Sequence, residues 1–306
     1  MASLKVGLVG AGVFGGYHAG KIAASERTDF VGIFDPDASR AEGLADKHGV
    51  RAIASDAELF SESDAILVAC PATYHASVVS GALKAGCHVL VEKPLALTGA
   101  DAQSLAELAD ANSRVLQVGH QERLVLEAMG FFDVSEAPIA IEAVREGPPA
   151  PDGRAGDVSV IWDLMIHDLD LAARLMGRGS DAYGRGLVHH TRHIDEAVAD
   201  LTFENGGTAV IMASRAAPER RRSMTVTYPS GKVFVDFLTR KVENSTSHII
   251  DGDTSAVLPD PLGAADEAFF AACLGERETP IPGREAAEAV RLAELVEQTA
   301  LAKIGA

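Results

Sequence analysis

The chain has 306 residues, of which 47% are hydrophobic and 23% are charged, as in ordinary folded proteins long enough for two domains. Its 27 lysines and arginines stand against 44 aspartates and glutamates, so the formal net charge is −17. So acidic a chain argues against nucleic acid or an anionic membrane surface as a partner. The 3 cysteines, without C-x-x-C spacing, predict buried, reduced thiols and a cytoplasmic protein. Because the first predicted strand begins at residue 4 and no apolar run reaches membrane-spanning length, we expect neither a signal peptide nor a membrane span.

The first predicted elements are an apolar strand at 4–9 and a helix that starts near Val13. The turn between them has the pattern G-x-G-x-x-G. Gly10 permits the tight turn, Gly12 removes a Cβ that would block a pyrophosphate, and Gly15 lets the helix lie close to the strand. The N–H groups at the start of the helix then favour the phosphates. The expected coenzyme contacts here are Gly10, Gly12, Val13, Phe14 and Gly15.

A second apolar strand, 30–34, ends on Asp35, about 20 residues past the last glycine of the turn. A carboxylate at this place accepts hydrogen bonds from the ribose hydroxyls and repels a 2′-phosphate, which favours NAD over NADP. Arg40 is the contrary signal, because an arginine just past the acid can pair with that phosphate. The alternative for Arg40 is a solvated helix face, which we favour.

Short apolar strands alternate with helices as far as residue 121, which predicts a Rossmann domain with a doubly wound parallel sheet. In such a sheet the ligand lies beyond the carboxyl ends of the strands. Several candidate contacts of the coenzyme and the substrate fall at or just past predicted strand ends. They are Cys70, Pro71, His75, Glu92, Lys93 and His120.

Lys93 stands between Glu92 and Pro94, directly after the strand 88–91. The neighbouring proline limits the backbone and permits a cis bond. Most lysines are surface residues, and that is the alternative for this one. Its place beside the expected nicotinamide predicts a substrate contact instead.

The pattern changes after residue 121, and 122–306 is predicted to be a second α/β domain. A strand at 138–146 and an amphipathic helix at about 158–176 precede a run of β segments that ends near residue 250. This run predicts a mostly antiparallel sheet with one open face, a common place for an oligomer interface or a substrate wall. Helices follow at about 261–274 and 284–304, and we expect the last one to pack back on the first domain.

Asp163 and His167 are spaced i and i+4 on the predicted helix, so their side chains meet on one face. Asp163 or Asp170 can orient the imidazole, and His167 can take a hydroxyl proton while hydride leaves the same carbon. A helix with an exposed acidic stripe and a satisfied histidine explains the spacing equally well. Both interpretations stay open at this point.

Two further clusters are less informative. His189, His190 and His193 suggest a metal, but neighbours in a strand point to opposite faces, so we expect no metal site. A basic cluster is either a solvated loop or a holder of a phosphorylated substrate, because arginine binds phosphate bidentately. Its members are Arg215, Arg220, Arg221 and Arg222.

Four motifs occur in order along nearly the whole chain: the glycine turn, C-P-x-x-x-H at 70–75, A-G-C-H-V-L-V-E-K-P at 85–94, and D-x-x-x-H at 163–167. In these motifs the chain resembles the Gfo/Idh/MocA oxidoreductases. The Glu-Lys-Pro element is far more specific than the glycine turn. The resemblance implies a Rossmann domain, a second domain built on a large open-faced sheet, and NAD(P)-dependent oxidation or reduction of a sugar or cyclitol carbinol.

The same resemblance implies that Lys93 and His167 form the substrate-binding and proton-transfer pair, with Asp163 beside them. It also implies a homodimer or homotetramer joined through the sheet. The stretches 118–123 and 163–170 look most like the branch that oxidises the 3-hydroxyl of UDP-N-acetylglucosamine. We therefore expect a nucleotide-sugar dehydrogenase. The alternatives are a free-sugar or inositol dehydrogenase of the family and a catalytically inactive NAD-binding regulator.

Overall fold

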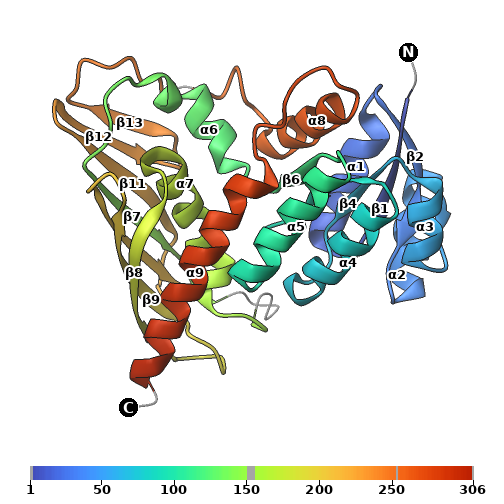
Figure 1. Cartoon of the computed structure of the whole chain (residues 1–306), viewed down its shortest axis with the longest axis horizontal. Helices are drawn as coiled ribbons and strands as arrows, with labels where there is room; N and C mark the ends of the chain where they lie inside the picture. Colours follow the sequence, from blue (N-terminus) through green and yellow to red (C-terminus); the bar gives the residue numbers. More distant parts are fainter. Residues whose placement is uncertain (1–2, 150–155, 253, 305–306) are drawn as a thin grey trace. The chain divides into compact units, whose positions relative to one another are not determined.

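The computed structural model describes residues 3–149, 156–252 and 254–304 (Figure 1). The chain forms two compact units, Met1–Gln121 with Asp260–Ala287, and Glu122–Pro259 with Glu288–Ala306. Among the described residues, no helix combines the length and the apolar character needed to cross a membrane.

The first unit contains a parallel sheet in the order β3-β2-β1-β4-β5-β6, as far as its described residues show. The strands are β1 (Leu4–Val9), β2 (Thr28–Phe34), β3 (Arg51–Ala52), β4 (Ala65–Val68), β5 (His88–Val91) and β6 (Leu116–Val118). All neighbours in the sheet run parallel. The central strand β4 is buried at every position, because helices cover both faces of such a sheet. The strand order reverses at β1 and β4, which is the place where a doubly wound fold binds dinucleotides.

The helices of this unit are α1 (Val13–Ala24), α2 (Ala38–His48), α3 (Asp56–Glu62), α4 (Ala72–Lys84), α5 (Gly99–Ala111) and α8 (Pro261–Cys273). Thr98 caps α5, because its hydroxyl accepts the Asp101 N–H at 3.0 Å. The predicted doubly wound sheet is confirmed.

Residues 260–287 belong to the unit of the parallel sheet, although the sequence-based division placed all of 122–306 in one domain. Helix α8 lies beside α1 (Figure 1). Its Phe269 and Phe270 belong to the same hydrophobic core as the buried residues of β1. Gln117 of β6 donates to the carbonyl of Ala265 at 2.8 Å and accepts from the Thr279 hydroxyl at 2.7 Å. These contacts between distant parts of the chain leave no periodic signal in the sequence.

The second unit is built on a sheet in the order β13-β12-β11-β7-β10-β9-β8, among the residues described. Its strands are β7 (Ala140–Glu146), β8 (Gly179–Leu187), β9 (Glu196–Phe203), β10 (Thr208–Ser214), β11 (Arg221–Tyr228), β12 (Gly231–Asp236) and β13 (Lys241–Asn244). Of the neighbouring pairs, β7 and β10 run parallel and the others antiparallel. The predicted mostly antiparallel sheet is confirmed.

One face of this sheet is covered by helix α7 (Ile166–Met176) and by most of α9 (Gly283–Ile304). Gly184 of β8 allows the close approach of α9, since a Cβ there would lie 2.1 Å from the carbonyl oxygen of Val296. Glu288 of α9 accepts the N–H of Gly179 at 2.8 Å. The sequence predicts that the last helix packs on the first domain. Residues 283–287 at its start belong to the first unit, where Arg284 donates to Asp110 of α5, and the contacts with β8 join the rest of the helix to the second unit.

The segment before α7 differs from the single helix that the sequence predicts. A π-helical turn, Ile161–Met165, precedes α7, and helix α6 (Glu122–Ala128) and the 3-10 turn Phe131–Asp133 open the unit. Single π turns occur frequently at functional sites, because the wider turn re-aims side chains. Asp163 lies in this turn and His167 lies in α7.

Candidate active site

The glycine-rich turn has the geometry that a bound pyrophosphate needs. Gly10 has φ +103, and a Cβ there would meet the backbone of Ala69 at 2.6 Å. A Cβ on Gly15 would overlap the carbonyl oxygen of Gly10 at 2.0 Å, so this glycine is required for the turn itself. A Cβ on Gly12 would meet nothing within 4 Å, and Gly12 caps α1 without a side-chain hydrogen bond. The first N–H groups of α1 thus have no side-chain cap from Gly12, and phosphate oxygens can accept them.

Asp35 is fixed at the carboxyl end of β2 beside this turn. Its Oδ2 accepts the Ala11 N–H at 2.7 Å, and its Oδ1 accepts the Asp37 N–H at 2.9 Å. These two bonds hold the carboxylate next to the glycine turn, as the ribose of NAD requires.

The start of α2 is also unsuited to a 2′-phosphate. Asp37 caps this helix by accepting the N–H groups of Ser39 and Arg40. Arg40 is 65% exposed and pairs with Asp37 at 3.2 Å. The donors that would bind an extra phosphate are thus already engaged by a carboxylate, and the residues fit NAD.

His75 joins two of the predicted strand ends. Its ring is 1% exposed, with Nδ1 2.6 Å from the Pro94 carbonyl and Nε2 2.9 Å from the Cys70 carbonyl. Burial, above all, lowers the pKa of this histidine. His75 therefore ties the turn after β5 to the end of β4, where Pro71 caps α4. Burial also raises the pKa of the Cys70 thiol to about 11, so this cysteine is no nucleophile.

Lys93 follows β5 in a turn whose Lys93–Pro94 peptide bond is cis. Its N–H donates to Oε2 of the buried Glu92 at 3.3 Å. The other carboxylate oxygen of Glu92 lies 3.2 Å from Nε2 of His18, whose Nδ1 lies 2.8 Å from Asp266. Burial lowers the pKa of His18, but the hydrogen bonds and charges of Asp266 and Glu92 outweigh it and raise the pKa to about 10. His18 is therefore a cation, and it holds the Glu92 carboxylate that accepts the N–H of Lys93.

His120 is the last of the predicted strand-end residues. It is 1% exposed just past β6, where its N–H donates to the Val118 carbonyl at 2.8 Å. The parallel topology thus places all the predicted strand-end residues of this unit at one edge of the sheet.

In the second unit, His167 is held by a carboxylate that the sequence analysis did not name as its partner. Nδ1 of His167 lies 2.8 Å from Oε2 of Glu122, the first residue of α6. The predicted partners were Asp163 or Asp170, and for Asp170 that prediction needs correction. Asp170 is buried and takes both forks of the Arg123 guanidinium, each at 2.7 Å.

Glu122 is part of a longer buried chain of charges. Its Oε1 accepts from Nη1 of Arg145 at 3.0 Å, and Arg145 makes two further bonds to Asp168 at 2.9 and 3.0 Å. Burial opposes the charge of Glu122, but His167 and Arg145 hold the pKa of its carboxyl well below the usual range. Glu122 is therefore a fixed negative charge beside Nδ1 of the His167 imidazole.

Asp163 and His167 are both partly exposed, while residues 159–173 around them, apart from Leu164, are buried. The exposed part of the segment thus carries an acid and an imidazole, and the buried part carries the acids that bind arginine. A sequence signal for these arginines existed. Asp168 and Asp170 alternate with leucines in an apolar helix, and buried carboxylates require cationic partners.

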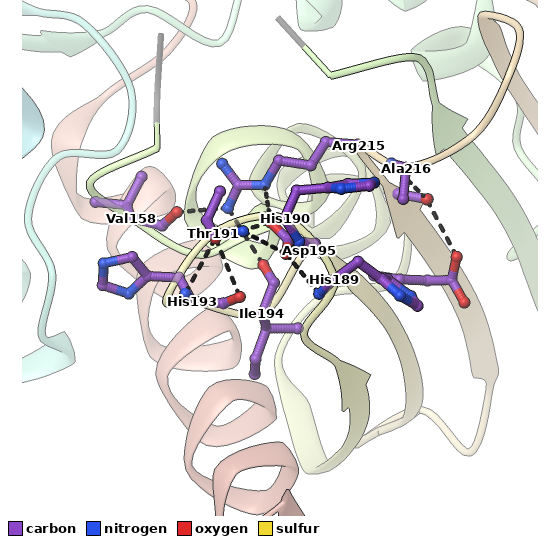
Figure 2. A network of polar contacts seen from close by, with 11 residues as sticks. Val158, His189, His190, Thr191, His193, Ile194, Asp195, Arg215 and Ala216 are labelled. Atoms are coloured by element: carbon purple, nitrogen blue, oxygen red, sulfur yellow. Dashed lines mark hydrogen bonds and ion pairs between the residues drawn. The ribbon is translucent and has the colours of Figure 1, made fainter. Parts of the chain in front are cut away.

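The histidines at 189–193 lie in a loop, not in a strand, because β8 ends at Leu187 (Figure 2). The buried carboxylate of Asp195 accepts the N–H groups of His189, His190 and Thr191 at 2.7 to 3.0 Å. Arg215 pairs with the same carboxylate at 3.1 Å. The described residues contain no group of three or more His, Cys, Asp or Glu side chains that could hold a metal ion.

A Rossmann unit whose turn and Asp35 fit NAD, and a sheet unit that carries a carboxylate-held histidine, define an NAD-binding oxidoreductase. Residues 4–120 match a family model described as "Oxidoreductase family, NAD-binding Rossmann fold". Residues 142–234 match the GFO/IDH/MocA C-terminal domain. The chain belongs to the GFO/IDH/MocA oxidoreductase family.

Among its relatives is UDP-N-acetylglucosamine 3-dehydrogenase of Acidithiobacillus ferrooxidans, 36% identical over 274 residues that cover 88% of this chain and 83% of the relative. A crystal form of that enzyme, GnnA, superimposes with a TM-score of 0.88 over 99% of both chains at 32% identity. The scyllo-inositol 2-dehydrogenase (NAD(+)) of Bacillus subtilis is 25% identical over 305 residues, which cover 91% of this chain and 88% of the relative. The WlbA dehydrogenase of Bordetella pertussis, solved with NADH and UDP-GlcNAcA, shares the fold with a TM-score of 0.88 at 20% identity over 98% of this chain and 96% of that one.

Proposed function

We propose that this protein is an NAD-dependent dehydrogenase that acts on a secondary hydroxyl of a nucleotide sugar, with UDP-N-acetylglucosamine as the first candidate. The observation that carries the proposal is the contact of His167 Nδ1 with Glu122 at 2.8 Å. A carboxylate in that position orients the ring and stabilises the imidazolium that proton abstraction produces. The likeness to the Acidithiobacillus enzyme supports the choice of substrate.

In this mechanism His167 is the base, and its Nε2 takes the proton of the substrate hydroxyl. The glycine turn and Asp35 would hold NAD, which would supply the hydride acceptor for the carbon that carries this hydroxyl. Lys93 polarises the oxygen as it becomes a carbonyl, and Asp163 and His120 contact the sugar. In the reverse direction His167 returns the proton to the alkoxide.

The same residues suit a free sugar or an inositol, and the likeness to the scyllo-inositol 2-dehydrogenase makes this the second candidate. The two candidates differ in the demand for an anion site, since only the nucleotide sugar carries a diphosphate.

We also propose that copies of the chain associate through the open face of the β7-containing sheet as a homodimer or homotetramer. The supporting observation is that the residues of this face are partly exposed and many are apolar. They include Val144, Val198, Val210, Met212 and Phe234. The free cysteines support a reducing compartment such as the cytoplasm.

Absorbance of NADH tests the enzymatic proposal directly. Purified protein with NAD is offered UDP-N-acetylglucosamine, other UDP-sugars, free hexoses and inositols. We expect reduction of NAD with the UDP-sugar. Reduction with inositol alone would favour the second candidate, and NAD binding without reduction by any compound would indicate an inactive NAD-binding regulator.

A further inference from the structure

The four arginines of the basic cluster separate into two pairs. Arg215 is bound to Asp195, and Arg221 pairs with Glu146 at 3.1 Å. Arg220 and Arg222 make no ion pair and no side-chain hydrogen bond within the part of the chain that the structure describes. Two guanidinium groups with unused donors therefore lie two positions apart along the chain, on either side of Arg221.

Arg222 occupies an unusual place for such a group. It lies directly opposite Arg145 on the neighbouring strand, so both side chains project from the same face of the sheet. That face is the one covered by α7, because Arg145 binds Asp168 there. Like charges opposite each other across a sheet are destabilising. The carboxylates at hand, Glu122 and Asp168, are already bound to Arg145.

Burial, followed by the charge of Arg145, lowers the pKa of Arg222, and Arg220 acts in the same direction. The positive charge of Arg222 is thus incompletely balanced, while its side chain is half-buried. A partly desolvated guanidinium without an acceptor is costly, and an anion that binds there removes the cost.

A chain of neighbouring side chains connects Arg222 with His167. His167 binds Glu122, Glu122 binds Arg145, and Arg222 is the cross-strand neighbour of Arg145. An anion on Arg222 would therefore sit within the same unit as the catalytic base, a few side chains from it.

We propose that Arg222 and Arg220 form an anion subsite that binds the diphosphate of the substrate. This inference rests on the proposed function and names the group that distinguishes a nucleotide sugar from a free sugar or inositol. Arginine forks match phosphate oxygens two at a time. Arg222 lies in β11, and Arg220 directly precedes that strand. Two guanidinium groups suit the two phosphates of a diphosphate.

Binding of inorganic pyrophosphate, measured by calorimetry, tests the subsite independently of catalysis. We expect the wild-type protein to bind pyrophosphate, and Arg222→Gln and Arg220→Gln to weaken it about 10-fold or more. Arg222→Lys keeps the charge but not the fork and should lie between. Arg221→Gln is the matched control, because Arg221 pairs with Glu146, and it should bind as the wild type does.

Kinetics then link the subsite to the substrate. With UDP-N-acetylglucosamine, Arg222→Gln should raise KM about 10- to 100-fold with kcat within about threefold, since the diphosphate does not react. Its Tm should be unchanged or higher, because an unbalanced buried charge is removed. A lower Tm together with unchanged pyrophosphate binding would show that Arg222 is structural and overturn the subsite.

The two proposals fail separately. Reduction of NAD with a free sugar or inositol, in a protein that does not bind pyrophosphate, would overturn the subsite and leave the dehydrogenase. Pyrophosphate binding that Arg222→Gln weakens, without reduction of NAD by any compound, would support the subsite and overturn the enzymatic proposal.

Discussion

Nδ1 of His167 and Oε2 of Glu122 lie 2.8 Å apart although 45 positions separate the two residues. Glu122 opens α6 at the first residue of the second unit, and His167 lies in the first turn of α7. Arg145 holds the other oxygen of the same carboxylate at 3.0 Å. Arg145 therefore fixes the position of the Glu122 carboxylate, and this carboxylate orients the imidazole of His167.

This contact predicts the effect of Glu122→Gln. The substitution keeps the shape but removes the charge that stabilises the imidazolium, so kcat/KM should fall about 10- to 100-fold. The acidic limb of its pH profile should move to lower pH, because a proton on His167 is then less favoured. Steady-state rates across pH measure both effects. Glu127→Gln, an exposed position on the same helix, is the control and should match the wild type. An unchanged profile in folded Glu122→Gln would remove Glu122 from its role as a positioning residue.

Lys93→Ala and His167→Ala should each lower kcat by ~10²-fold or more while NAD still binds. The reason is that each removes a group proposed to act on the reacting hydroxyl and not on the coenzyme phosphates. Stopped assays give kcat, and NAD titration by calorimetry gives the affinity. Lys84→Ala, an exposed lysine at the end of α4, is the control. Turnover at the wild-type rate in either variant would exclude that residue from catalysis.

Some of this site could be predicted from the sequence because the signals are local. The glycines, Asp35 and the strand-end position of Lys93 depend on spacing within about 20 residues, and the alternation of strands and helices identifies the parallel sheet. In each case neighbouring residues determine the backbone that positions the group. The resemblance to a family, carried by the D-x-x-x-H motif, supplied the role of His167.

The partners of these groups could not be predicted, because folding brings them together from far apart. Asp266 reaches His18 across 248 positions, and Glu122 belongs to a short helix without a periodic pattern. The sequence predicts one helix over 158–176 and does not indicate the π-helical turn that carries Asp163. Charged residues in apolar segments signalled that ion pairs exist, but not which residues form them.

The carboxylates beside the glycine turn predict the choice of coenzyme. Asp35→Ala should weaken NAD binding about 10-fold, since the ribose hydroxyls lose their acceptor. The double variant Asp35→Ser, Asp37→Ser should bind NADP better than either single variant, because Asp37 now occupies the α2 N–H groups and Arg40. Fluorescence titration with NADH and NADPH measures both affinities. Asp46→Ala, an exposed site on α2, serves as control. Equal NADPH affinity in the double variant and the wild type would contradict this account.

The loop in Figure 2 predicts a stability effect without a direct part in catalysis. Asp195→Ala leaves three backbone N–H groups without their acceptor and removes the ion pair of Arg215, so it should destabilise the fold by about 3 kcal/mol or more. Urea denaturation followed by circular dichroism measures this. His190→Ala is the matched control, because it removes an exposed ring and keeps the backbone N–H. Equal stability of the two variants would show that the carboxylate does not organise the loop.

His18 predicts how stability depends on pH. Its pKa is about 10 in the folded protein against an ordinary 6.5, so the folded state binds the proton more tightly than the unfolded chain. The stability from this proton is fully present below pH 6.5 and is lost as the pH rises toward 10. Thermal unfolding of the wild type should therefore occur at a lower Tm at pH 9 than at pH 6.5. In His18→Gln, Tm should be lower at pH 6.5 and should fall less between the two values, while His189→Gln, an exposed histidine, should follow the wild type. If Tm declined equally in His18→Gln and in the wild type, His18 would carry no additional proton between Glu92 and Asp266. The backbone of Lys93 would then have no support from a charged His18.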